Sequence, residues 1–228
     1  MRTLVIGDIH GCLRAVTSVI DAAAPARQDQ LIFLGDYVDR GPDSRGVIDF
    51  LLALARRHIV IALTGNHEEL MLGAREGPQM LRAWTLSGGD ATLASYRGGG
   101  VAFSEALAAV PDEHWRFIES CGDYHETASH IFVHGYLDAD LSMAMQETTV
   151  LRWRKFVDPR PHCSGKTVIC GHTAQRDGNP VNLGHAICID TFAYGGGWLT
   201  CMDVETGRLW QANQQGAIRT GNIAGYRR

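Results

Sequence analysis

Six side chains that can bind metal ions lie in five short segments of the chain, all of which contain glycine. The segments are Gly-Asp-Ile-His-Gly at 7–11, Gly-Asp-Tyr-Val-Asp-Arg-Gly at 35–41, Gly-Asn-His-Glu at 65–68, His-Gly at 134–135 and Gly-His-Thr at 171–173. They supply Asp8, His10, Asp36, Asn66, His134 and His172. Carboxylates, imidazoles and amide oxygens are ligands that hard and borderline divalent metals accept. The set therefore predicts a centre for two metal ions.

Hydrolysis of a phosphate monoester is a reaction that such a centre could perform. It needs a nucleophilic oxygen near neutral pH, neutralisation of charge on the phosphoryl oxygens, and a proton for the leaving alcohol. Two ions ~3.5–4 Å apart can hold a bridging water, lower its pKa from ~15.7 toward ~7 and clamp the phosphoryl oxygens. A bridging carboxylate keeps two cations that close. The sequence therefore predicts a two-metal phosphoester hydrolase.

Asp36 is the candidate bridge, because it directly follows an apolar run at 31–34. Asp8 and His10, two residues apart in a turn, can converge on one ion. The second ion would be completed by Asn66, His134 and His172. Asp8 beside His10 is weak evidence alone, and an asparagine after glycine is ordinary turn chemistry. The complete set in this order favours the metal site over a purely structural role.

The elements that must position these residues alternate in the first ~75 residues. Short apolar runs are followed each time by helical spacing of apolar residues. The runs lie at 4–6, 31–34 and 59–63, and the helical stretches at 13–24, 45–57 and 67–74. Such repetition indicates a parallel sheet with helices packed on it. Since α/β proteins place their sites at the carboxyl ends of such strands, the candidate ligands are expected to meet there.

Residues 77–130 break this alternation. Trp84, the Ser87-Gly88-Gly89 turn, the glycine run at 98–100 and Pro111 punctuate two or three helical stretches. We interpret the segment as a mainly helical insertion that lies over the site, a candidate substrate cap. The alternative is a set of helices that only completes the fold.

Strand-like segments dominate the rest of the chain, at 131–133, 167–169, 186–189, 199–204 and 208–211. The Glu205-Thr206-Gly207 turn indicates an antiparallel hairpin between the last two. Residues 216–228 have weak patterning and are expected to be poorly ordered. A single domain over residues 1–228 is the simplest interpretation.

Composition limits the partners and the compartment. The 228 residues are 45% hydrophobic and 20% charged, which is ordinary for a globular domain, and the net charge of −4 argues against a nucleic-acid or anionic-membrane surface. No apolar run approaches the ~18 residues of a membrane span, and the N-terminal run is too short for a signal peptide. Six scattered cysteines without a Cys-x-x-Cys pair favour reduced thiols in a cytoplasmic protein.

The five motifs together resemble those of the metallophosphoesterases and, within them, the phosphoprotein phosphatase family. The resemblance is to the small bacterial and bacteriophage lambda-type serine/threonine phosphatases. It extends to Ile189-Asp190-Thr191, to Gly196-Gly197-Trp198-Leu199-Thr200 and to Trp84-x-x-Ser87-Gly88-Gly89. It implies an α/β fold, a four-layer αββα sandwich with a small helical cap insertion, and the same six metal ligands. Tyr136 departs from the family, which usually has a small residue there.

The resemblance also implies roles for the residues around the ligands. His67 would donate the proton to the leaving group, and Asp39 would hold that imidazole and favour its charged form. Arg40 would bind phosphoryl oxygens with its planar fork, as would a second arginine, for which Arg154 is favoured over Arg152. Asn66 would also face the phosphate.

Each of these roles has a structural alternative. Asp39 and Arg40 could form a surface ion pair, and His67 could be an ordinary helix-start histidine. Tyr194 matches loosely a tyrosine that larger relatives place near the phosphate, but core packing explains it equally well.

The implied activity is hydrolysis of phosphoserine or phosphothreonine, with phosphotyrosine as an extension, by attack of a hydroxide that bridges two divalent ions. Manganese is expected, with iron or zinc as alternatives. Dinucleoside tetraphosphate hydrolases share the motifs, so a nucleotide polyphosphate is the alternative substrate. A catalytically inactive phosphate-binding module would be expected to lack His67 or a ligand, and none is missing. A dinucleotide-binding Rossmann domain is disfavoured, because the two glycines of the 7–11 segment do not have the Gly-x-Gly-x-x-Gly spacing.

Overall fold

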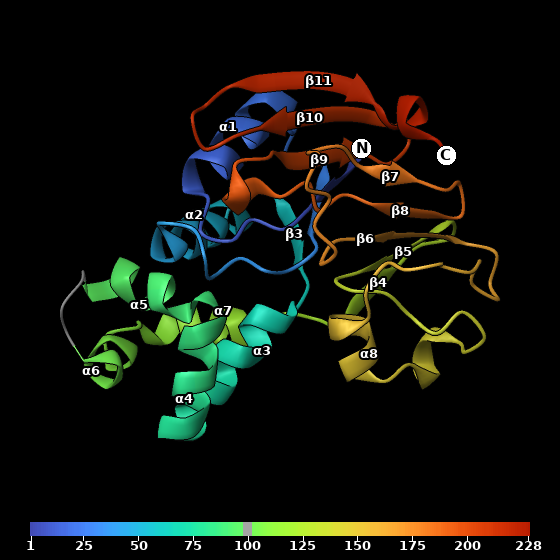
Figure 1. Ribbon diagram of the computed structural model, residues 1–228. Coiled ribbons are helices and arrows are strands. Elements are labelled where there is room, and N and C mark those ends of the chain that lie inside the picture. The colour runs from blue at the N-terminus through green and yellow to red at the C-terminus, as the bar shows by residue number, and fades with distance from the viewer. Residues whose placement is uncertain (98–101) are drawn as a thin grey trace.

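Two β-sheets lie face to face in the structure, a computed structural model that describes residues 1–97 and 102–228 (Figure 1). The first sheet has the strand order β11-β10-β9-β1-β2-β3 and the second β4-β5-β6-β8-β7. The first contains β1 (Thr3–Ile6), β2 (Gln30–Phe33), β3 (Ile59–Ala62), β9 (Leu199–Asp203), β10 (Arg208–Ala212) and β11 (Ile218–Asn222). The second contains β4 (Tyr124–Glu126), β5 (His130–Val133), β6 (Thr167–Cys170), β7 (Val181–Asn182) and β8 (Ala186–Cys188).

Alternating side chains on the central strands build two separate cores. On β1, Leu4 and Ile6 face the helices, whereas Val5 belongs to the core between the sheets. This is the alternation that a pleated strand imposes. The inter-sheet core is completed from the second sheet by residues such as Phe132 and Ile169. Both faces of β1 are therefore buried, which explains why its sequence is a continuous apolar run.

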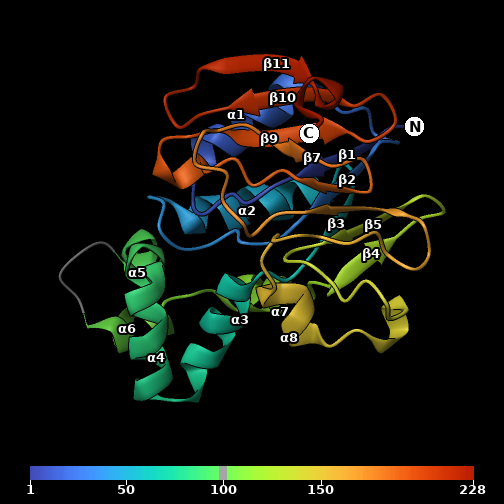
Figure 2. The ribbon, with the colours of Figure 1, turned by 45° about the vertical axis from the view of Figure 1, so that its right-hand side comes forward.

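Helices cover the outer face of the first sheet. Helix α1 (Leu13–Ala23) and α2 (Ser44–Ala55) pack against it, and α3 (Asn66–Gly73) follows β3. The outer face of the second sheet is covered by α8 (Thr148–Trp153), a 3₁₀ turn at Met143–Met145 and loops. The expected α/β arrangement of two stacked sheets between outer layers is confirmed, although the layer outside the second sheet is thin (Figure 2).

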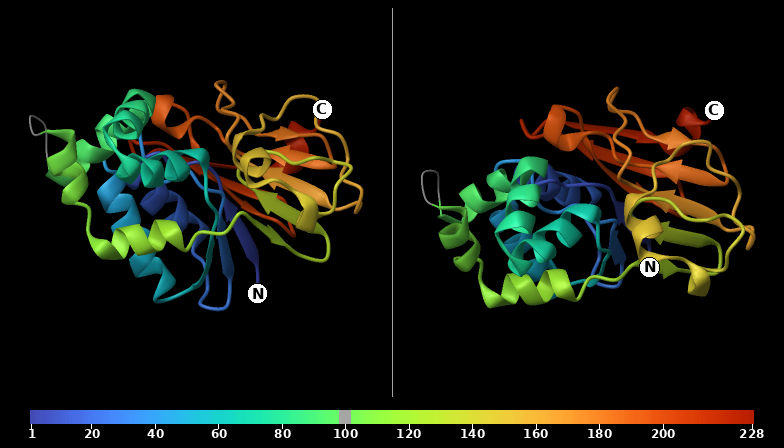
Figure 3. Two further views of the ribbon diagram at one scale, coloured as in Figure 1. Left: turned by 90° about the horizontal axis from the view of Figure 1, so that it is seen from below. Right: turned by 60° about the horizontal axis from the view of Figure 1, so that its bottom comes forward.

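The segment after α3 is helical, as expected, but shorter than predicted. It contains α4 (Pro78–Trp84), α5 (Asp90–Arg97), α6 (Phe103–Ala108) and α7 (Asp112–Glu119), which gather on one side of the molecule (Figure 3). Residues 124–126 are not part of a helical insertion, because β4 pairs antiparallel with β5. The glycine run at 98–100 lies outside the described residues.

The expectation of a poorly ordered C-terminus is wrong. Strand β11 pairs with β10 along five residues, and the following 3₁₀ turn at Ile223–Tyr226 buries Ile223. The sequence pattern was weak because β11 is an edge strand with mostly exposed side chains, so its ladder rests on backbone hydrogen bonds rather than on apolar alternation. The predicted hairpin between β9 and β10 is confirmed.

Parallel strands carry their carboxyl ends to one edge in both sheets. Strands β1, β2 and β3 are mutually parallel in the first sheet, and β5, β6 and β8 are parallel in the second. Five of the six candidate ligands lie in the loops that follow these strands, and the sixth, Asn66, is the first residue of α3 after β3. Among the helices that the structure describes, none combines the length and the apolar character needed to cross a bilayer.

Candidate metal centre

The carboxylate of Asp36 lies between two imidazoles that come from different segments of the chain. Its Oδ2 is 3.3 Å from Nε2 of His10, and its Oδ1 is 3.3 Å from Nε2 of His134. The group is almost fully buried, after β2 in a left-handed backbone conformation with φ of 51°. Each oxygen faces a different ligand, which is the arrangement that a carboxylate bridging two ions requires.

Backbone carbonyl groups fix which nitrogen of each imidazole faces the centre. Nδ1 of His10 donates to the Val38 carbonyl and Nδ1 of His134 to the Leu34 carbonyl, both at 2.9 Å. Their Nε2 lone pairs therefore point toward Asp36. Burial lowers the pKa of His10 to about 3 and that of His134 below its usual value. Both shifts favour the neutral ring, which is the form that can act as a metal ligand.

Three hydrogen-bond acceptors converge at the opposite side of the centre. Nε2 of His172 donates to the Trp153 carbonyl at 3.1 Å, so its Nδ1 carries a lone pair. That atom is 2.8 Å from Oδ1 of Asn66, which is itself 3.1 Å from Nε2 of His134. With the ring protons directed at carbonyl groups, no proton is left to join these acceptors. A cation would satisfy all three.

Asp8 supplies a further buried oxygen without a partner. Its Oδ2 accepts from the backbone N–H of His172 at 2.9 Å, but Oδ1 finds no hydrogen-bond partner within the described residues. Burial, followed by the charges of Asp190 and Asp36, raises the pKa of Asp8 well above its usual value. Gly171 is needed beside it, since a Cβ there would collide with Oδ1. The donor set therefore fits divalent cations, whose charge would relieve this repulsion.

Left-handed backbone is concentrated in these loops. Non-glycine residues adopt it only at a cost of order 1–3 kcal/mol each, so surrounding contacts must hold them there. The site residues with positive φ are His10, Asp36, Asp39, Arg40 and His172. The glycine-rich motifs thus mark sharp turns that aim side chains inward.

Glu68 is an organising residue that the sequence analysis missed. Its buried carboxylate accepts backbone N–H groups from Asp36 at 2.7 Å, Tyr37 at 2.8 Å and Gly65 at 2.9 Å. It stands in the first turn of α3 and so joins the loop after β2 to the loop after β3. The available signal was a glutamate three residues after the helix N-cap, a position from which a carboxylate can accept the N-cap backbone N–H.

His67 lies beside the ligands and is paired with Asp39. Nδ1 of His67 is 2.6 Å from Oδ2 of Asp39, with both side chains buried. The ring of His67 packs edge-to-face on that of His10, with centroids 4.8 Å apart. Burial alone would lower the pKa of His67, but the charges of Asp36 and Asp39 raise it above its usual value. The arrangement is suited to a proton donor.

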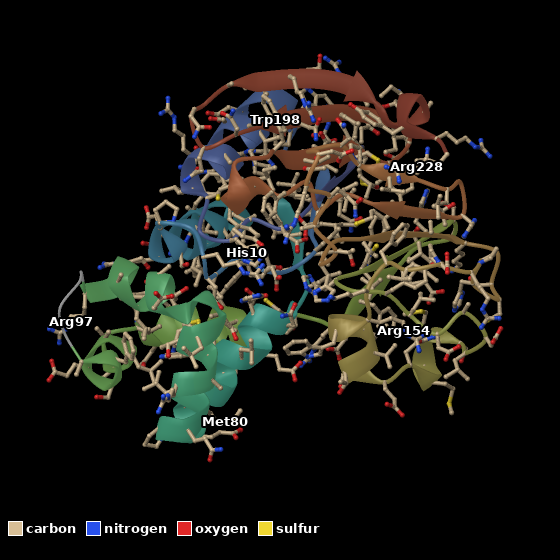
Figure 4. All side chains as sticks on the ribbon, viewed as in Figure 1. His10, Met80, Arg97, Arg154, Trp198 and Arg228 are labelled. Atoms are coloured by element: carbon tan, nitrogen blue, oxygen red, sulfur yellow. The ribbon has the colours of Figure 1, made fainter. Side chains whose placement is uncertain are left out.

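The two predicted phosphate-binding arginines lie in different environments. Nη1 of Arg40 is 3.0 Å from Nε2 of His10, and its guanidinium lies over the ring of Tyr194 at 4.7 Å. Arg154 instead donates to the Leu137 carbonyl at 2.9 Å and lies beside α8, apart from His10 (Figure 4). The carboxylate of Asp138 lies 3.8 Å from the same guanidinium. A role for Arg154 at the phosphate would therefore require its side chain to turn.

The geometry also places Arg152, the other candidate arginine, and Tyr194, for which both a site role and core packing were expected. Arg152 is bound to Asp123 at 2.6 Å and to Glu69 at 3.1 Å. Tyr194 packs edge-to-face on His10, with ring centroids 4.8 Å apart, and it also packs against the core under the first sheet, so it lies where the core meets the centre.

Comparison with known families and proteins agrees with this arrangement. The family model of the calcineurin-like phosphoesterases matches residues 1–176. Serine/threonine-protein phosphatase 1 of Salmonella typhimurium is 41% identical over 87 residues, which are 38% of this chain and 38% of that protein. The symmetrical bis(5'-nucleosyl)-tetraphosphatase of Burkholderia pseudomallei is 37% identical over 79 residues, 35% of this chain and 27% of that enzyme. These alignments thus span well under half of the curated relatives.

Solved structures resemble the fold over nearly the whole chain. A cold-active protein-tyrosine phosphatase of a Shewanella species has a TM-score of 0.64 and 15% identity, with 96% of this chain and 80% of that chain covered. A structure provisionally assigned as a diadenosine tetraphosphatase has a TM-score of 0.65 and 20% identity, with 97% and 93% covered. At such identities the likeness establishes the fold alone.

Replacement of the central carboxylate should weaken metal binding throughout the centre. In Asp36→Asn an amide N–H₂ would replace one of the two oxygens that face the imidazoles. We expect affinity for manganese to fall more than about tenfold at both sites, measured by calorimetric titration of the metal-free protein. Asp140→Asn, on the surface, is the control. Loss of only one ion would contradict the bridging position.

Replacement of the organising carboxylate should destabilise the loops themselves. Glu68→Gln would leave a single acceptor oxygen for the N–H groups that the carboxylate now receives. The free energy of unfolding of the metal-free protein, measured with urea, should fall by about 1–3 kcal/mol. Glu69→Gln changes a partly exposed neighbour and should cost much less. Equal losses in the two variants would show that Glu68 does not organise the loops.

Proposed function

Because this chain belongs to the calcineurin-like phosphoesterase family, we propose that it is a metal-dependent phosphoprotein phosphatase. Its substrates would be phosphoserine and phosphothreonine monoesters, with phosphotyrosine as an extension. The observation that carries the proposal is the position of Asp36 between two sets of ligands, with a histidine–carboxylate pair beside them.

Two divalent ions would complete the centre. Asp8, His10 and Asp36 would hold one, and Asp36 with Asn66, His134 and His172 would hold the other. We propose manganese, with iron or zinc as alternatives, because the set mixes oxygen and imidazole ligands. Such ions, when bound, supply charge neutralisation for a phosphoryl group and activation of the attacking water.

The protein's own groups would complete the reaction. His67 would give its proton to the oxygen of the leaving alcohol, while Asp39 holds the ring by its Nδ1. Arg40 would turn its guanidinium from His10 to the phosphoryl oxygens. Asn66 faces His134 and His172 with its Oδ1, which leaves its amide nitrogen to donate to the same phosphoryl group.

A protein substrate is favoured over a nucleotide by two features. The stretch between β5 and α8 contains only a short 3₁₀ turn. A long insertion before the Arg152–Arg154 segment would have favoured a nucleotide substrate, and none lies in this stretch. The Salmonella relative, whose name is that of a protein phosphatase, is also the more similar over its aligned part. Dinucleoside tetraphosphate hydrolysis at the same centre is the alternative, supported by the Burkholderia relative.

A side-by-side assay would separate the two substrate classes. Metal-stripped protein reloaded with manganese would be given a phosphoserine peptide and diadenosine tetraphosphate in parallel. The proposal expects phosphate release from the peptide. Release of ADP from the dinucleotide, with the peptide inert, would leave the site assignments in place and overturn the substrate. Inertness toward both would contradict the manganese phosphatase.

The acid role of His67 makes the rate depend on the leaving group. His67→Asn should lower kcat about 10²-fold or more for phenyl phosphate, whose leaving group needs a proton. The loss should be much smaller for p-nitrophenyl phosphate, whose leaving group departs without one. His125→Asn, a substitution away from the centre, serves as the control. Equal losses on both substrates would argue against proton donation.

A further inference from the structure

Asp39 is held by more than the histidine beside it. Its Oδ2 accepts from the indole Nε1 of Trp84 at 2.8 Å, in addition to Nδ1 of His67 at 2.6 Å. Its Oδ1 accepts from the hydroxyl of Thr92 at 2.7 Å. Asp39, Trp84 and Thr92 are all at 0% exposure. Two of the three side chains on this carboxylate therefore come from the helical segment at 78–97.

The hydroxyl of Thr92 fixes both the side chain and the backbone of Asp39. Its one proton goes to Oδ1, and its lone pairs accept the backbone N–H of Asp39 at 2.8 Å and face the Ser44 hydroxyl at 2.9 Å. Asp39 has a φ of 73°, in the left-handed region. The threonine thus stabilises a backbone conformation that directs the carboxylate at His67.

The irregular turn between Trp84 and Thr92 is shaped for this contact. Gly88, with a φ of +113°, accepts the backbone N–H of Arg40 at 3.0 Å, and a Cβ on it would lie 2.7 Å from Cγ of Arg40. A Cβ on Gly89 would collide with the indole of Trp84. The two glycines therefore let the turn close over Asp39 and Arg40 together.

We propose that Trp84 and Thr92 are positioning residues for the Asp39–His67 pair, and that the helical segment acts in the reaction through them. The proposal rests on the phosphatase mechanism given above. It assigns to this segment a contribution to proton donation in addition to any role as a substrate cap. With three donors on two oxygens, the carboxylate has little freedom to rotate, so the imidazole that it binds is oriented as well.

Donor removal with little change of shape tests the proposal. Trp84→Phe removes the indole N–H, and Thr92→Val removes the hydroxyl while keeping the branched side chain. We expect kcat for phenyl phosphate to fall about tenfold or more, and kcat for p-nitrophenyl phosphate to change less than about twofold, with KM unaltered. Thr92→Ser should restore the wild-type ratio of the two rates. Trp115→Phe, at a tryptophan stacked on Arg75, is the control.

A second measurement needs no metal and no turnover. In metal-free protein labelled with ¹⁵N-histidine, the Nδ1 proton of His67, which is shared with Asp39 over 2.6 Å, should resonate far downfield. Trp84→Phe and Thr92→Val should shift or broaden that signal, and Trp115→Phe should not. If Thr92→Val or Trp84→Phe is too unstable for kinetics, the signal of Thr92→Ser, which keeps the hydroxyl, can still be compared with that of the wild type.

The outcomes separate the proposal from the function on which it rests. Equal losses on the two phosphate esters, together with an unmoved histidine signal, would show that Trp84 and Thr92 only fill space, and would overturn the proposal. If His67→Asn itself shows no leaving-group dependence, the proposed acid mechanism fails first. If His67→Asn shows that dependence but Trp84→Phe and Thr92→Val do not, only the positioning role is wrong.

Discussion

The structure depends on a group of buried acceptors that have more lone pairs than there are donors to fill them. Asp36, Asn66 and the lone pairs of His10, His134 and His172 face one another, while the ring protons of the three histidines are directed at backbone carbonyl groups. The donors that do reach the group are the backbone N–H of His67, on Asp36, and Nη1 of Arg40, on His10. Asp8 adds an oxygen with no partner among the described residues. Such a group is unfavourable without positive charge. This is the physical reason for treating it as a centre for divalent cations rather than as a polar core.

The two-sheet architecture is what brings these groups together. Loops after β1 and β2 supply the carboxylates and His10, and the start of α3 after β3 supplies Asn66. Loops after β5 and β6 supply His134 and His172. Neither sheet alone holds the full set, so the apolar packing between the sheets sets the separation of the ligands. Glu68 then fixes the loops within the first sheet, and the segment from Trp84 to Thr92 fixes the turn that carries Asp39 and Arg40. Stability and chemistry thus depend on the same contacts.

Much of this could be predicted from the sequence, because each ligand follows an apolar run that folds into a strand, buried in most cases and partly exposed in β3. The parallel arrangement places such residues at one edge whatever the details of the loops. Other features depend on contacts that no local pattern encodes. Glu68 lies in a motif but carries no local sign of the N–H groups that it accepts, and the weak pattern of β11 reflects its exposed side chains. For Arg154, a local pattern says nothing of its contact with the Leu137 carbonyl, and its place at the phosphate stays a prediction. The partners of Asp39 in the helical segment, 45 and 53 residues away, required the tertiary structure.

We propose that the Asp36 carboxylate joins two metal ions. Electron paramagnetic resonance of the protein titrated with manganese tests it directly, because ions that share a bridge are magnetically coupled. With Asp36 as the bridge, a second equivalent of manganese should replace the signal of isolated ions by that of an exchange-coupled pair. A signal of uncoupled ions that persists at two equivalents, or saturation at one equivalent, would contradict it.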